Sequence, residues 1–137
     1  MVYTMLVPHL QFDINKRVDS LKKKEFLDKV ETIFSQIMQT GNEHIAISFR
    51  ELDQYSLQLG RSKNSDYICL INLDIRKGRS QSQKRKLVRS YMNLVTEYFD
   101  VETTNQYVTL TDHNGEDFNL YEKSLMDWKK NDKPIDN

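Results

Sequence analysis

The sequence has few of the residues that cross-link or stiffen a chain, with one cysteine, two prolines and four glycines in 137 residues. The single cysteine, Cys69, cannot form an internal disulfide, and its place in an apolar run indicates a small buried side chain. Long apolar runs are also missing, so no transmembrane helix is predicted. The opening MVYTMLVPHL lacks the basic start and long apolar stretch of a signal peptide, and we expect a cytoplasmic protein.

Net charge is missing too, since 20 Lys and Arg residues balance 20 Asp and Glu residues. No global field therefore favours nucleic acid or an anionic membrane. The three histidines, His9, His44 and His113, have no metal-ligand spacing, so neither a metal nor a cofactor is predicted. His44 and His113 are interpreted as a strand residue and a turn residue.

The length suits a single domain that covers residues 1–137. Within it we distinguish an extension (1–7), a core (8–118) and a C-terminal segment with a polar tail (119–137). The loop from Asp53 to Ser65 is long and mostly polar, which is typical of a functional loop.

Alternating apolar and polar residues predict four strands, and apolar residues at helical spacing predict two helices. We expect strands at Met5–Ile14, Glu43–Leu52, Asp66–Ile75 and Gln106–Asp112, and helices from Ser20 to Thr40 and from Ser80 onward. The predicted fold class is α+β, with two consecutive β-α-β units that form a four-stranded mixed sheet with two helices on one face. The other face would need a cover, which predicts homo-oligomerisation.

The junction of the third strand and the second helix carries Arg76, Gly78, Arg79 and Ser80, and it predicts an anion site. The N–H groups of a first helical turn are unpaired, and the helix dipole is positive there. An arginine fork matches a carboxylate in two-point contact. The alternative is two solvated charges at a strand–helix junction.

Four segments, PHLQFDI from Pro8, LQLGRSKNSDYICL, RKGRSQSQKRKLV and NQYVTLTDHNGEDF, resemble the tautomerase superfamily. This superfamily includes 4-oxalocrotonate tautomerase, macrophage migration inhibitory factor (MIF) and cis-3-chloroacrylic acid dehalogenase. The resemblance implies an MIF-like fold, a barrel-like homotrimer with its sheets inside, and keto–enol isomerase activity on a small carboxylate or 2-oxo acid.

The same resemblance implies a set of substrate-binding residues. Arg76 and Arg79 match the arginines that hold a substrate carboxylate in dehalogenase-like members, and Arg61 lies in a loop that neighbours the pocket. Tyr107 sits where relatives bring pocket groups from the C-terminal part, as do Glu116 and Asp117. For Arg61 the alternative is an ordinary loop charge, and for the last three it is structural hydrogen bonding.

Pro8 matches the N-terminal proline whose free amine is the catalytic base of active members, but seven residues precede it here. Its nitrogen is then a tertiary amide with no proton and a delocalised lone pair, so it cannot act as a base unless the chain is cut after Val7. A strand-initiating proline is the alternative. His9 follows directly and is the best substitute base.

Three functions stay open at this point. The first is a tautomerase-like protein that binds a small carboxylate or 2-oxo acid, with isomerase activity if Pro8 is freed. The second is a non-catalytic trimeric ligand-binding or interaction protein. The third, a nucleic-acid-binding module, rests on the basic helix side Lys84, Arg85, Lys86 and Arg89 and ranks last because net charge is zero. Expected partners are a small carboxylate and further copies of the chain, with no nucleic acid and no membrane.

Overall fold

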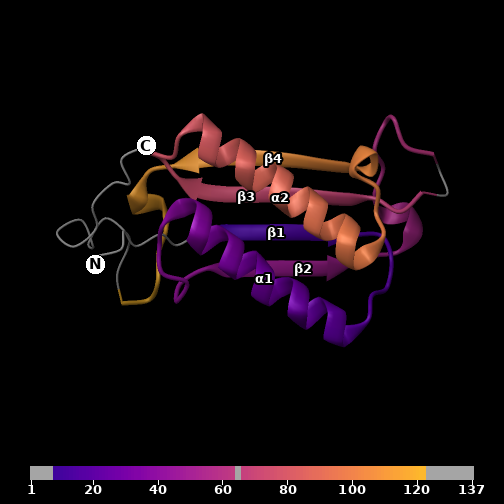
Figure 1. The fold of residues 1–137 in the computed structure, drawn as a ribbon, viewed down its shortest axis with the longest axis horizontal. Coiled ribbons are helices and arrows are strands. Elements are labelled where there is room, and N and C mark those ends of the chain that lie inside the picture. Colours follow the sequence, from indigo (N-terminus) through magenta and orange to yellow (C-terminus); the bar gives the residue numbers. More distant parts are fainter. Residues whose placement is uncertain (1–7, 64–65, 123–137) are drawn as a thin grey trace.

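A computed structural model describes residues 8–63 and 66–122 of the chain (Figure 1). The predicted extension (1–7) and most of the predicted C-terminal segment (123–137) lie outside the described residues. The strands are β1 (His9–Ile14), β2 (Ala46–Glu51), β3 (Cys69–Arg76) and β4 (Gln106–His113), and the α-helices are α1 (Ser20–Met38) and α2 (Gln81–Phe99). Single turns of 3-10 helix follow at η1 (Gln54–Ser56), η2 (Thr103–Asn105) and η3 (Gly115–Asp117).

The four strands form one sheet in the order β2-β1-β3-β4. β1 runs parallel to β2 and antiparallel to β3, while β3 runs parallel to β4. Both helices lie on the same face of the sheet, and each crosses over between two parallel strands (Figure 1). The predicted fold class is therefore confirmed, with two β-α-β units joined side by side at their antiparallel first strands.

The predicted elements are present, with ends that differ by a few residues. The strand predicted from Met5 begins at His9 in the structure: Pro8 precedes the strand, and residues 5–7 lie outside the described range. α1 ends at Met38 rather than Thr40, since Gln39 turns left-handed with a φ of 54° and donates its N–H to the Ser35 carbonyl. A left-handed residue at this place is a common helix stop.

The core lies between the two helices and one face of the sheet. Tyr91 of α2 donates its hydroxyl to the Val30 carbonyl of α1 at 3.0 Å, which joins the helices inside the core. The ring of Phe26 meets those of Phe12 and Phe99 at centroid distances of 5.1 and 4.9 Å. Such aromatic contacts add to the stabilisation that burial provides.

β3 is a central strand of the sheet, and only one of its faces is buried. Its odd-numbered residues from Cys69 to Ile75 belong to the core, and its even-numbered residues from Leu70 to Arg76 are partly exposed. Cys69 is confirmed as a buried residue, and burial raises the pKa of its thiol to about 12. A thiol with such a pKa is protonated and inert at neutral pH.

The face of the sheet away from the helices is mostly polar. Its side chains alternate with the core residues along each strand: His9, Gln11 and Asp13; Ala46, Ser48 and Arg50; Leu70, Asn72, Asp74 and Arg76; Tyr107, Thr109, Thr111 and His113. A face of this composition needs no apolar cover. We expected homo-oligomerisation because this face of the sheet would need a cover. Since the face is mostly polar, burial of apolar surface does not supply that reason.

Candidate anion-binding site

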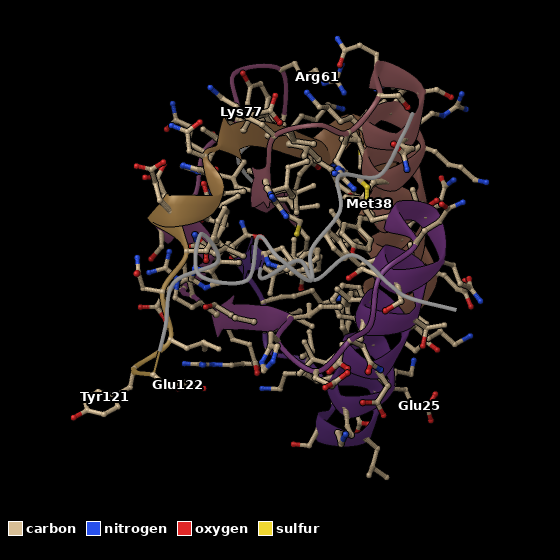
Figure 2. All side chains as sticks on the ribbon, turned by 90° about the vertical axis from the view of Figure 1, so that its left-hand side faces the viewer. Glu25, Met38, Arg61, Lys77, Tyr121 and Glu122 are labelled. Carbon is tan, nitrogen blue, oxygen red and sulfur yellow. The ribbon has the colours of Figure 1, made fainter. Side chains whose placement is uncertain are left out.

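One end of the sheet gathers the start of β1, the end of β3, the start of α2 and the end of β4 (left in Figure 1; facing the viewer in Figure 2). Lys77, labelled in Figure 2, belongs to the connection from β3 to α2. Its N–H donates to the carbonyl of His113 at 2.8 Å. This bond ties the end of β4 to the segment that carries the two arginines.

The connection turns sharply at Gly78, whose φ of 107° is open mainly to glycine. Ser80 then caps α2: its hydroxyl accepts from the Gln83 N–H, and the Gln83 side chain accepts from the Ser80 N–H, both at 3.0 Å. This capping box corrects our expectation of open N–H donors, because part of the helix N-terminus is already occupied.

Arg79 is buried, with 5% of its surface exposed. None of its three guanidinium nitrogens makes a hydrogen bond with any residue that the structure describes. Arg79 is therefore no solvated charge. Burying an ionised group without a counter-charge is unfavourable, so the arrangement is complementary to an anion.

The two arginines of the corner act on one another electrostatically. Burial, and to a smaller extent the charge of Arg76, together lower the pKa of Arg79 to about 10. Burial also lowers the pKa of Arg76. A ligand that brings negative charge between them relieves both effects, and a carboxylate does so with two acceptor oxygens.

Pro8 directly precedes β1 and is buried. Its carbonyl accepts from the Ala46 N–H of the neighbouring strand at 3.0 Å, which is the position expected for a strand-initiating proline. His9 points to the polar face, where its Nε2 lies 2.6 Å from the Ser48 hydroxyl. The predicted substitute base is thus hydrogen-bonded to a serine.

A histidine that we assigned to a turn has a carboxylate partner. His113 is the last residue of β4, paired in register with Arg76 of β3, so the turn assignment was wrong. Its Nε2 lies 2.8 Å from Oδ1 of Asp74. The pair comes from two strands that are far apart in sequence; only the parallel alignment of β3 with β4 would have revealed it.

The structure does not bring Arg61 and Tyr107 to this corner within one chain. Arg61 donates its Nε to the Thr104 carbonyl at 2.6 Å, beside the start of β4. Tyr107 is the second residue of β4, paired with Leu70. His113 comes six positions after Tyr107 along β4, which corresponds to about 20 Å. Within a single chain, therefore, these two predicted residues lie apart from the arginine corner.

The basic side of α2 is partly neutralised. Lys84 contacts Asp112 at 2.6 Å. Arg85 and Arg89 line an open groove together with Arg61. The two arginines of the corner are not among the residues that line this groove.

Neither α1 nor α2 has the length and apolar character needed to cross a membrane, and no other helix of the described residues does. Within 8–63 and 66–122, no three His, Cys, Asp or Glu side chains gather in a way that could hold a metal ion.

Comparison of the sequence with protein-family models and with curated proteins finds no match. Solved structures do match. An MIF-like protein from Entamoeba histolytica superposes with a TM-score of 0.73 at 15% identity, over 86% of this chain and 98% of that one. Pt0534 inactivated by 2-oxo-3-pentynoate gives 0.77 at 16% identity, over 87% and 97%. A wild-type fused 4-OT, described as a symmetric trimer, gives 0.77 at 17% identity, over 86% and 96%.

These likenesses define the class of fold. The chain has the fold of the MIF and 4-OT tautomerase structures, and it covers nearly the whole of each. The resemblance predicted from the sequence is confirmed at the level of the fold. At identities of this size the comparison establishes the fold alone.

Proposed function

We propose that this chain is a tautomerase-superfamily protein that binds a small carboxylate, or a 2-oxo acid, at the Arg76–Arg79 corner. The observation that carries the proposal is the guanidinium of Arg79, which is buried and has no hydrogen-bond partner among the described residues. A buried cation of this kind is stabilised when an anion supplies the missing acceptors.

The chemistry of the corner favours a carboxylate over a larger anion. Part of the α2 N-terminus is occupied by the Ser80–Gln83 capping box, so fewer backbone donors remain for a phosphate than at an open helix end. Two arginines close together suit a planar group with two oxygens. One solved structure of the same fold is of a protein inactivated by 2-oxo-3-pentynoate, which supports 2-oxo acids as the ligand class.

Titration calorimetry with phenylpyruvate tests this proposal on the ligand side. We expect heat of binding with phenylpyruvate and a loss of affinity of at least about tenfold with its methyl ester, since a charge-assisted hydrogen bond contributes roughly 1.5–3 kcal/mol. The ester keeps the ring and the keto group but removes the charge. Equal affinity for the two compounds would exclude carboxylate recognition.

We further propose a homotrimer, because the fused 4-OT structures of this fold are described as trimers. Within one chain, Arg61 and Tyr107 lie away from the arginine corner. In a trimer, the Arg61 or Tyr107 of a neighbouring copy would lie close to it. Sedimentation equilibrium should give a mass near three times 16.3 kDa. A mass of one chain would exclude the trimer while leaving the arginine corner intact.

A further inference from the structure

The carboxylate of Asp74 is the centre of a small polar network on the open face of the sheet. Three side chains reach it: His113 through Nε2 at 2.8 Å from Oδ1, Asn72 through Nδ2 at 2.9 Å from Oδ2, and Gln11 through Nε2 at 3.3 Å from Oδ2. An ionised carboxylate only accepts hydrogen bonds, so the nitrogen of His113 that faces it carries the proton. The other ring nitrogen, Nδ1, then holds a lone pair.

Nδ1 of His113 is available for chemistry. The nearest carboxylate oxygen on that side, Oδ2 of Asp117, is 3.8 Å away, which is beyond hydrogen-bond distance. The ring of Phe118 stands edge-on to the imidazole at 5.5 Å and 87°, which restricts the rotation of His113. The His113 side chain keeps 30% of its surface exposed. An imidazole whose Nε2 is hydrogen-bonded to a carboxylate and whose Nδ1 is accessible can act as a general base.

The position of His113 links it to the arginine corner. It is the register partner of Arg76, and strands in a sheet lie about 5 Å apart. Its carbonyl also accepts from Lys77, in the segment that leads to Arg79. In a 2-oxo acid, the carbon that loses its proton is two bonds from the carboxylate carbon. A carboxylate bound by the arginines therefore leaves that carbon close to the end of β4.

We propose that His113 is the proton-transfer residue of this site and that Asp74 is the residue that positions it. The inference rests on the proposed carboxylate binding. It also supplies a base in place of Pro8, whose nitrogen is an amide with a delocalised lone pair.

The step is balanced without any further reactant. Nδ1 of neutral His113 takes a proton from C3 of the bound 2-oxo acid. The electron pair of the broken C–H bond forms the C2–C3 double bond, and the C2 carbonyl becomes an enolate oxygen. The imidazolium then returns its proton to that oxygen or to C3, which gives the enol or the keto form. Asp74 and Asp117 flank the imidazolium from two sides, and Arg76 faces it from the adjacent strand position.

His9 is the competing candidate, since it lies on the same face of the sheet. Its Nε2 contacts the Ser48 hydroxyl at 2.6 Å, and a serine neither carries charge nor stabilises an imidazolium as a carboxylate does. Only the pairing with Asp74 gives a histidine of this face both a fixed tautomer and a counter-charge. The structure therefore assigns the role to His113.

Two measurements on the full-length protein test this proposal. Calorimetry measures the binding of phenylpyruvate, and absorbance measures its keto–enol conversion. We expect wild-type protein to bind and convert it. H113Q should bind within about threefold of wild type but lose roughly 100-fold or more of kcat, the usual contribution of a general base. Adding imidazole should restore part of the turnover of H113A, a gain that a merely structural role would not show. H44Q, at a histidine outside the site, is the matched control and should leave turnover unchanged.

Asp74 is tested by a readout that does not depend on turnover. Nitrogen NMR of the His113 ring should show the Nε2–H tautomer in wild type and a mixture of tautomers in D74N. D74N should also lose at least about tenfold in kcat with little change in KM, as expected for a positioning residue. Circular dichroism confirms that each variant is folded, and H113N serves if H113Q does not fold.

The outcomes separate this inference from the proposed function. Binding of phenylpyruvate with no conversion by wild type would overturn the proton-transfer role and leave the carboxylate site standing. Full turnover by H113Q, or loss of turnover in H9Q alone, would likewise overturn it. Absence of phenylpyruvate binding by wild type would overturn the proposed function, and the role of His113 with it.

Discussion

The guanidinium of Arg79 is buried beside Arg76, and the two effects of burial and like charge bring its pKa down to about 10 from an ordinary 12.5. No described residue offers it a hydrogen-bond acceptor. This relationship is what distinguishes the corner from an ordinary pair of surface arginines. It also makes the site measurable, because a guanidinium that titrates near pH 10 affects both binding and stability.

Carboxylate binding should weaken at high pH. An anion binds the protonated guanidinium, which prevails below the folded-state pKa of about 10 and is lost above it. Affinity for phenylpyruvate should therefore be constant up to about pH 9.5 and fall by about tenfold per pH unit above pH 10. Calorimetric titrations between about pH 8 and about pH 11 check this. Constant affinity to the top of that range would mean that Arg79 is not the binding group.

Replacing Arg79 by methionine should stabilise the protein when no small anion is present. The variant keeps most of the side-chain volume and removes a buried charge that no described residue compensates. Exchanges of buried charged groups for apolar ones are often stabilising by about 1–4 kcal/mol. We expect a gain of roughly 1 kcal/mol or more in urea unfolding, together with loss of phenylpyruvate binding.

Arg89→Met is the control for that experiment, since Arg89 is exposed on α2. It should change the free energy of unfolding by no more than about 0.5 kcal/mol. A destabilised R79M would indicate that Arg79 has a structural role and that the buried charge is already compensated.

Gly78→Ala should both destabilise the chain and weaken binding. The φ of 107° is a conformation that L-residues rarely adopt, although no atom lies within 4 Å of the added Cβ. Strain alone should cost about 1–3 kcal/mol, and its relief would move the segment between Arg76 and Arg79. Gly60→Ala is the matched control: its Cβ would also meet nothing within 4 Å, and no unusual φ is involved. Equal effects of the two substitutions on urea unfolding would contradict this account.

Tyr91→Phe should lower the free energy of unfolding by about 1–2 kcal/mol, because the Val30 carbonyl loses its buried donor. Tyr55, which is 81% exposed, provides the control, and Tyr55→Phe should be neutral. Thermal unfolding of both variants measures the difference. A neutral Tyr91→Phe would show that the hydroxyl does not contribute to holding α1 against α2.

Much of the fold follows from local patterns in the chain. The helical spacing of apolar residues, the Ser80–Gln83 cap and the period-two strands are properties of short segments, and each is present in the structure. The Arg76–Arg79 corner was predictable for the same reason, since both arginines belong to one continuous segment.

What could not be predicted depends on how distant segments align. His113 meets Asp74, 39 residues earlier, only because β3 and β4 run parallel in one particular register. Arg61 and Tyr107 end up at the opposite end of the strands, and spacing along the chain contains no information on that distance. The polar character of the open face likewise emerges only when four separate strands are placed side by side.

The most direct test of the account is a calorimetric titration of phenylpyruvate into wild-type protein, R79A and R89A at neutral pH. Because the central claim is that the buried guanidinium of Arg79 binds the carboxylate, R79A should lose about 10- to 100-fold in affinity while R89A matches wild type. Unchanged affinity in R79A, or an equal loss in both variants, would contradict the claim.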